Sequence, residues 1–162
     1  MSQETRILFV CQGNIIRSPL AEHMFKHLAE QAGLSDQFYV RSAGTSSYHV
    51  GESPDSRMRR VAAKNGFKYT GRARQFQTAD FNNFDLIIAM DTQNLSILKR
   101  LAGSSEEHLA KLRTMRTFDP EGDFDQSVPD PYYGGIDGFQ ITFDIVKRSS
   151  QGLLEALQKG AV

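Results

Sequence analysis

The chain has 162 residues, of which 40% are apolar and 23% are charged, as in an ordinary globular domain. Its 19 Lys and Arg residues balance its 19 Asp and Glu residues, which argues against nucleic-acid binding driven by net charge. No apolar run approaches the roughly 20 residues that span a bilayer, so membrane insertion is not expected. The N-terminus is polar, and the single cysteine cannot pair within the chain. We therefore expect a cytoplasmic protein, with secretion without a signal peptide left open.

Short apolar runs alternate along the chain with longer segments of helical periodicity. Four β-rich runs predict strands: Ile7–Val10, Phe38–Val40 (closing at Ser42-Ala43-Gly44), Leu86–Ala89 and a weaker one within 112–118. Helices are expected from Ser18-Pro19 to Gly33, from Ser53-Pro54 to Gly66, from Asn94 to Gly103, and after a polar loop over 119–138. Strands that alternate with helices predict an α/β fold with a parallel sheet. We expect a three-layer open sandwich, in which helices cover both faces of a four-stranded parallel sheet.

The only cysteine, Cys11, directly follows the first predicted strand, in the stretch VCQGNIIRSP. The loop contains Gly and Asn, which tolerate positive φ, and the helix expected at Ser18-Pro19 offers unpaired N–H groups to an anion. Backbone N–H groups of this loop can surround a tetrahedral dianion, and the planar fork of Arg17 can close the ring. The loop residues that would do so are Gln12, Gly13, Asn14, Ile15 and Ile16.

A free cysteine is most often a small buried apolar residue, and Cys11 taken alone would be interpreted in that way. Its place between a strand, an anion-binding loop and a helix N-terminus favours a thiolate beneath a bound phosphate. Such a thiolate is a nucleophile directed at phosphorus. The loop is not the nucleotide-binding P-loop, because the chain contains no G-x-x-x-x-G-K-[ST] run.

The stretch VCQGNIIRSP resembles the signature of the low-molecular-weight protein tyrosine phosphatases. The resemblance continues in SAGTSSYHVGESPD, ARQF, FDLIIAMD and VPDPYYGG, and covers about residues 5–158. It implies one phosphatase domain over 1–162 that hydrolyses phosphotyrosine and aryl phosphates through a phosphocysteine intermediate, without a metal or cofactor. It also implies a tyrosine-phosphorylated protein as partner. Bacterial members often act opposite tyrosine kinases, so a cognate kinase is one candidate substrate.

The segment VPDPYYGG places Asp130 between two prolines that restrict the loop on both sides. Composition alone favours a plain turn, since Asp-Pro is a common turn dipeptide. In the family that this segment resembles, the aspartate protonates the leaving tyrosine oxygen. The resemblance therefore identifies Asp130 as the general acid, acting with Cys11 as nucleophile and Arg17 as phosphate ligand.

Further site residues come from the same resemblance. Asn14 is similar to the asparagine that shapes the family's loop in a strained conformation, and Ser42 to a serine bonded to that asparagine. Ser18 is similar to a hydroxyl that supports the thiolate, and it also suits the cap of the following helix. Three tyrosines of this chain resemble the aromatic residues that enclose a phosphotyrosyl ring in the family: Tyr48, Tyr132 and Tyr133.

Two positions depart from the family pattern. Many members carry a second cysteine at the position of Ile16, so a protective disulfide with Cys11 is not possible here. Several members carry a histidine at the position of Gly71 that supports the loop asparagine, and this support is missing here.

Two other functions fit the sequence less well than phosphatase activity does. An arsenate reductase of the same fold would need two further thiols, and Cys11 is alone. A non-catalytic phosphotyrosine-binding module should lack the nucleophile, the arginine or the acid, and all three are present.

Charge is unevenly spread along the chain. Basic residues crowd the middle of the sequence and acidic residues crowd the later polar loop, and both groups are interpreted as solvated surfaces. The basic residues are Arg57, Arg59, Arg60, Lys64, Lys68, Arg72 and Arg74.

Overall fold

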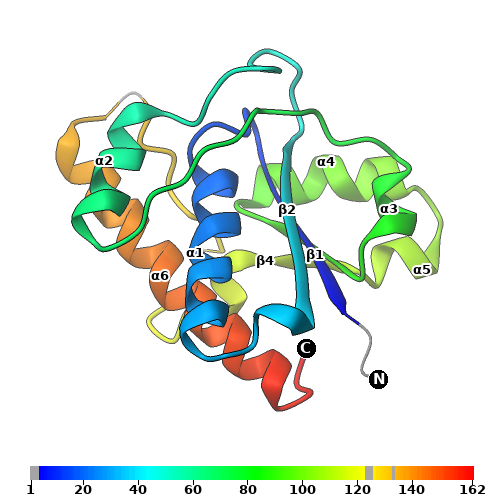
Figure 1. The fold of residues 1–162 in the computed structure, drawn as a ribbon. Helices are drawn as coiled ribbons and strands as arrows, with labels where there is room; N and C mark the ends of the chain where they lie inside the picture. The colour runs from blue at the N-terminus through cyan, green and yellow to red at the C-terminus, as the bar shows by residue number, and fades with distance from the viewer. Residues whose placement is uncertain (1–3, 123–125, 133) are drawn as a thin grey trace.

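The computed structural model describes residues 4–122, 126–132 and 134–162, and its centre is a four-stranded sheet (Figure 1). The strands are β1 Thr5–Cys11, β2 Phe38–Gly44, β3 Leu86–Ala89 and β4 Leu112–Thr114. They are arranged in the order β2-β1-β3-β4, and every neighbouring pair is parallel. The predicted four-stranded parallel sheet is therefore confirmed.

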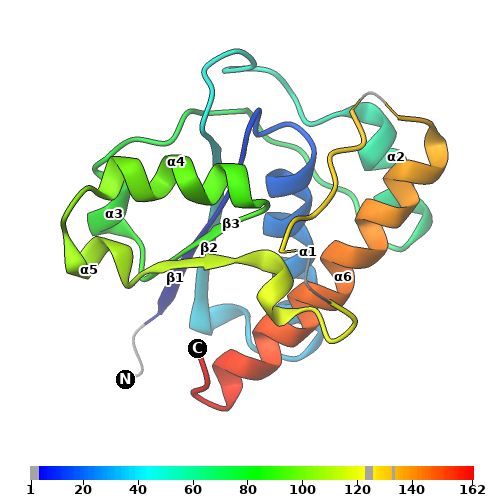
Figure 2. The ribbon, with the colours of Figure 1, turned by 180° about the vertical axis from the view of Figure 1, so that it is seen from behind.

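Helices cover both faces of the sheet, as Figures 1 and 2 show from opposite sides. One face carries α1 Arg17–Gln31, α2 Ser56–Lys64 and α6 Ile136–Gln158. The other face carries α3 Asp80–Asn83, α4 Thr92–Ala102 and α5 Glu106–Leu109. Two short 3₁₀ helices complete the described elements, η1 Ser35–Gln37 and η2 Met115–Phe118. The three-layer sandwich is thus confirmed as well.

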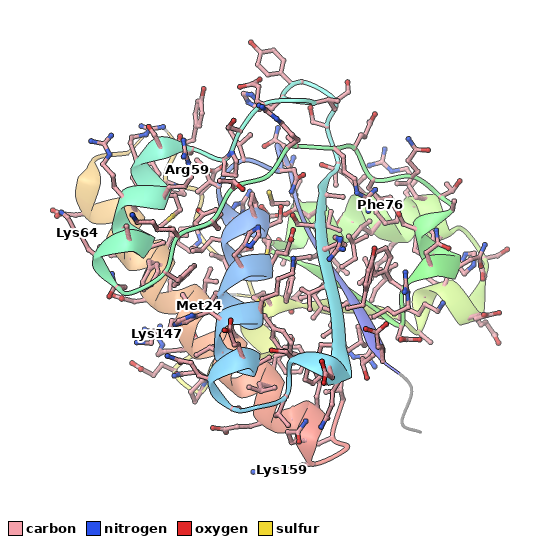
Figure 3. The ribbon with its side chains drawn as sticks, in the orientation of Figure 1. Met24, Arg59, Lys64, Phe76, Lys147 and Lys159 are labelled. Carbon is pink, nitrogen blue, oxygen red and sulfur yellow. The ribbon has the colours of Figure 1, made fainter. Side chains whose placement is uncertain are left out.

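Strand β1 is the centre of both hydrophobic cores. Successive side chains of a strand point to opposite faces, so Ile7 and Phe9 pack with α1 and α6, whereas Leu8 and Val10 pack with the α4 side. All four are fully buried, which explains why this strand is a continuous apolar run in sequence. Figure 3 shows Met24 and Phe76, one from each core, on opposite sides of the sheet.

The first two helices do not begin at the residues predicted for them. The first helix begins at Arg17, and its cap residue Ile16 makes no side-chain cap bond, so Ser18 is not the cap. The second helix begins at Ser56 and not at Ser53-Pro54. Asp55 caps it by accepting a hydrogen bond from the Arg57 N–H at 2.8 Å, a role that carboxylates commonly take.

The remaining differences concern short elements. The helices α3 and α5 were not predicted, because four residues are too few to establish a period. The stretch 112–118 is a three-residue strand followed by a 3₁₀ helix. Helix α4 begins two residues before Asn94, where Asp91 caps it through the Asn94 N–H at 2.6 Å. The polar loop ends at α6, which starts at Ile136.

A buried carboxylate joins η2 to α6. Asp119 accepts hydrogen bonds from Arg148 Nε at 3.1 Å and Nη2 at 3.3 Å, and from the Glu121 N–H at 2.9 Å. Burial by itself raises the pKa of Asp119, but the hydrogen bonds from Arg148 and Glu121 outweigh it and lower the pKa below its ordinary value. Next to this cluster the helix approaches the 3₁₀ turn so closely that a Cβ at Gly152 would overlap the carbonyl oxygen of Phe118.

Asp119→Asn should destabilise the protein by about 2 kcal/mol near neutral pH, because it removes a charge-assisted hydrogen bond to a buried acceptor. The native carboxylate has a lowered pKa, so its contribution is present above the pKa of the unfolded state and is lost as pH falls through the folded-state value. Urea unfolding from about pH 6 to about pH 3 should therefore show a weaker pH dependence in the variant. Asp36→Asn, at an exposed carboxylate, is the control, and equal losses in both variants would contradict the assignment.

Candidate active site

The loop between β1 and α1 holds Cys11 at the carboxyl end of the central strand. Cys11 is 3% exposed, and its Sγ lies 2.9 Å from Ser18 Oγ and 3.3 Å from the Asn14 backbone N, which donates to it. Ser18 is in the first turn of α1, so the helix places its hydroxyl under the sulfur. The sulfur thus has two polar neighbours at the start of the helix.

Asn14 fixes the course of this loop. Its φ is 57°, the only positive φ of a non-glycine residue in the described part of the chain. Its Nδ2 donates to Ser18 Oγ at 2.9 Å and to Ser42 Oγ at 3.0 Å, and its Oδ1 accepts from the Arg74 N–H at 2.9 Å. Ser42 in turn donates to Glu22 Oε1 at 2.7 Å. Three elements thus hold the strained residue in place.

The missing histidine at Gly71 does not leave the asparagine without support. The backbone of the segment that contains ARQF provides the Arg74 N–H bond, and this segment extends the sheet edge by pairing Gln75 with Gly44. The Asn14 side-chain amide therefore has partners at both its oxygen and its nitrogen.

Several loop amides are free to bind an anion. In the described residues, no acceptor is present for the backbone N–H groups of Gln12, Gly13, Ile15 and Ile16. The loop carbonyls are used instead, since the Thr45 and Ser46 N–H groups donate to Cys11 O and Gln12 O, both at 2.9 Å. This arrangement leaves donors without acceptors at the start of α1, the site at which helices bind phosphate.

Arg17 is buried with its guanidinium held from one side. It is 3% exposed, and its Nη1 donates to Asp91 Oδ2 at 2.7 Å and to the Val128 carbonyl at 2.9 Å. Asp91 follows β3, so the pair joins the carboxyl ends of the two central strands. Asp91 is the last residue of the stretch FDLIIAMD, and its position just after a predicted strand was the available signal in the sequence.

Asp130 reaches the same place from the loop before α6. Its Oδ2 lies 3.5 Å from Arg17 Nη2, and its side chain is 41% exposed. The Val128 N–H donates to Met90 O at 2.7 Å and Thr142 Oγ1 donates to Pro129 O at 3.1 Å, so β3 and α6 both hold the loop. The fold therefore brings together the predicted nucleophile, phosphate ligand and general acid, which are Cys11, Arg17 and Asp130.

These residues surround a pocket of about 480 Å³. Its rim is aromatic. The ring centroid of His49 lies 4.7 Å from that of Tyr48 and 6.1 Å from that of Tyr132, and Tyr48 is 83% exposed. Tyr133, the third predicted wall, lies outside the described residues. The lining comprises Cys11, Gln12, Gly13, Ile15, Ile16, Arg17, Ser46, Tyr48, His49, Asp130 and Tyr132.

The predicted residues thus divide into two groups. Most line the pocket, whereas Asn14, Ser18 and Ser42 lie behind the loop and act on it through hydrogen bonds. Sequence reasoning missed Ser46 and His49, which line the pocket. His49 also packs on the loop, since a Cβ at Gly13 would be 2.9 Å from His49 Cδ2. A histidine directly after Tyr48 was the only signal available.

Comparison with known proteins identifies the family of the chain. Residues 6–162 match the family model described as low molecular weight phosphotyrosine protein phosphatase. The chain is 45% identical over 157 residues to a low molecular weight protein-tyrosine-phosphatase of Streptomyces coelicolor, covering 95% of this chain and 94% of the relative. The chain belongs to the low-molecular-weight phosphotyrosine protein phosphatase family.

Solved structures confirm the fold. A protein tyrosine phosphatase from Entamoeba histolytica, with Hepes in its active site, superposes with a TM-score of 0.92 at 38% identity and covers 98% of this chain and 100% of its own. A Drosophila arginine phosphatase superposes with a TM-score of 0.86 at 33% identity, covering 94% of this chain and 97% of its own. The fold is therefore shared by phosphatases named for different phosphorylated residues.

Asn14→Ala should lower both stability and phosphatase activity, because it strains the backbone and removes the side-chain bonds to Ser18 and Ser42. Asn14→Gly removes the same bonds but accepts a positive φ without strain, so it should be more stable than the alanine variant by about 1 kcal/mol. Both should lose at least about tenfold in kcat/KM, since a loose loop no longer presents its amides. Urea unfolding and steady-state kinetics measure these effects, and an alanine variant as stable as the glycine variant would exclude a strained Asn14.

Proposed function

We propose that this protein hydrolyses phosphotyrosine in proteins, with Cys11 as nucleophile, Arg17 as phosphate ligand and Asp130 as general acid and then base. One observation carries the proposal: the buried Cys11, the fixed guanidinium of Arg17 and the Asp130 carboxylate line one pocket. The loop between β1 and α1 lines the same pocket and has free backbone amides. We further propose that residues 1–162 form one phosphatase domain with its core at about 5–158, which the family match over 6–162 supports.

In the first step the Cys11 thiolate attacks phosphorus and the bond from phosphorus to the tyrosine oxygen breaks. Asp130 gives its proton to that oxygen, so a neutral phenol leaves. The equatorial phosphoryl oxygens carry the charge of the transition state. Arg17 is oriented for them, because Asp91 and the Val128 carbonyl occupy Nη1 and leave the other side of the fork toward the pocket.

In the second step water hydrolyses the phosphocysteine. Asp130, now ionised, takes a proton from the attacking water, and the bond from phosphorus to sulfur breaks to release inorganic phosphate and the thiolate. Ser18 Oγ and the Asn14 N–H stabilise the departing sulfur, since they lie 2.9 Å and 3.3 Å from it. The charge of the phosphate is neutralised by Arg17 and the loop amides.

The rim of the pocket favours an aryl phosphate. Phosphate at the base of a pocket walled by Tyr48, His49 and Tyr132 places the next atoms of the substrate between aromatic rings. A phosphotyrosyl ring fills that space by stacking, whereas a short phosphoseryl chain does not. Because a related fold belongs to an arginine phosphatase, phosphoarginine peptides are the informative competitor: faster turnover of these than of phosphotyrosine peptides would contradict the proposed substrate.

Cys11→Ser should abolish turnover of p-nitrophenyl phosphate, by about 10⁴-fold or more, because a serine hydroxyl in this site is not ionised. The loop amides and Arg17 are unchanged, so vanadate or phosphate should still bind. Calorimetric titration of the variant with vanadate serves as the control for an intact site. Retained turnover would rule out Cys11 as the nucleophile.

Asp130→Ala should slow hydrolysis of phenyl phosphate by about 10²- to 10⁴-fold, the usual loss when a general acid is removed. The native enzyme needs an ionised Cys11 together with a protonated Asp130, so activity should peak on the acid side and decline toward higher pH. The variant should lose this decline, because the group that must keep its proton is gone. Asp137→Ala, at an exposed carboxylate in the first turn of α6, is the matched control. A native optimum above about pH 8, or an unchanged profile in the variant, would contradict the role.

A further inference from the structure

One segment of the chain holds a large local excess of positive charge. Residues 56–79 contain seven of the 19 Lys and Arg residues and no Asp or Glu. All 19 acidic residues therefore lie elsewhere, with only 12 basic ones. The zero net charge of the chain thus conceals one basic surface on an otherwise acidic protein.

The basic segment lines a second depression, of about 450 Å³, beside α2. Arg59, Arg60 and Lys68 line it, and Lys64 lies one turn beyond Arg60 on the same helix. We call these four residues, with the depression, the basic groove. Figure 3 shows Lys64 at the outer edge of the molecule on α2, on the same side as Arg59.

The cations of the basic groove have no carboxylate partner in the described part of the chain, although Arg59 Nε donates to the Pro54 carbonyl at 3.0 Å and Arg60 Nε to the Ser56 carbonyl at 3.5 Å. Within the described residues none of the four has a carboxylate within 4.0 Å, whereas nearby Arg57 pairs with Asp55 at 2.8 Å. Unpaired charges of one sign repel each other, so their clustering costs stability that a bound anion would offset.

A buried tyrosine that lines the basic groove also has a polar atom without a partner in the described residues. Tyr69 is 5% exposed and lines the depression, and its hydroxyl has no hydrogen-bond partner among the described residues. Burial raises the pKa of this hydroxyl, so it stays protonated and remains a donor.

Helix α2, which carries three residues of the basic groove, also contacts the wall of the catalytic pocket. At the start of α2, Arg57 Nη1 donates to the Tyr132 carbonyl at 3.4 Å, and the guanidinium lies 5.7 Å from the centroid of the Tyr132 ring. Helix α2 has nine residues, which at about 1.5 Å each span about 13 Å. An extended peptide advances about 3.3 Å per residue and covers that distance in about four residues.

We propose that the basic groove binds an acidic segment of the phosphoprotein substrate, about three to six residues from the phosphotyrosine. The proposal rests on the proposed function, because it requires the phosphotyrosine to occupy the catalytic pocket. A polypeptide fits better than nucleic acid or a membrane, because the surface is local and lies on a helix that contacts the pocket wall. The rest of the molecule is net acidic and repels extended polyanions.

The test compares phosphotyrosyl peptides that carry Glu or Gln at three to six positions before or after the phosphotyrosine. For the native enzyme, the Glu peptide should have a KM about tenfold lower than the matching Gln peptide, with similar kcat. This should hold with the substituted residues either before or after the phosphotyrosine, or in both cases. The triple variant Arg60→Gln, Lys64→Gln, Lys68→Gln should lose this preference and hydrolyse p-nitrophenyl phosphate normally. Raising NaCl from about 50 mM to about 500 mM should erase the preference in the native enzyme.

The matched control removes the same charge elsewhere: Lys99→Gln, Arg100→Gln, Lys159→Gln, on exposed positions of α4 and after α6. Figure 3 shows Lys159 at the other end of the molecule from α2. Equal KM values for Glu and Gln peptides in the native enzyme, or an equal loss in the control, would overturn the proposal. So would binding of phosphatidylserine vesicles or single-stranded DNA that the triple variant loses while peptide kinetics stay unchanged. Failure to hydrolyse p-nitrophenyl phosphate at all would instead refute the proposed function.

Discussion

The ion pair between Arg17 and Asp91 is the interaction on which the site depends. It joins Arg17, in the first turn of α1, to Asp91, two residues after β3, at 2.7 Å, and both residues lie at the carboxyl edge of the sheet. Asp91 also caps α4, and Arg17 holds the Val128 carbonyl of the loop that carries Asp130. Breaking a buried ion pair costs about 3–5 kcal/mol. This one contact therefore fixes the orientation of Arg17 and, through Arg17, the position of the loop that carries Asp130.

A second constraint acts on the loop itself. Five residues between a strand and a helix can turn their amides to a common centre only if the backbone leaves the ordinary regions, and Asn14 does so at φ 57°. Its bonds to Ser18, Ser42 and the Arg74 N–H come from α1, β2 and the segment along the sheet edge. The strain is thus offset by packing that the whole α/β fold supplies, which explains why the site cannot be separated from the sheet.

The basic residues on and near α2 and the catalytic pocket differ in whether they are paired with carboxylates. Near the pocket, the cations of Arg17 and Arg57 are paired with carboxylates and hold structure. On α2 and just after it, the cations of the basic groove have no carboxylate within 4.0 Å among the described residues. Paired charges orient groups with little net field, whereas unpaired ones attract an anion over about a Debye length. Catalysis and substrate selection would therefore use neighbouring but physically different sets of basic residues.

The sequence by itself determined the sheet, the order of the main elements and the chemical residues Cys11, Arg17 and Asp130, because apolar period, turn residues and motif spacing are local properties. It did not determine where helices begin: Ser18 suits a cap, yet its hydroxyl serves Cys11, and Asp55 caps α2 instead. Nor could it find Asp91 as the partner of Arg17, 74 residues away, or His49 as a wall of the pocket. Only the tertiary structure decided these, because they depend on which strand ends and loops meet in space, and on which hydrogen bonds remain available there.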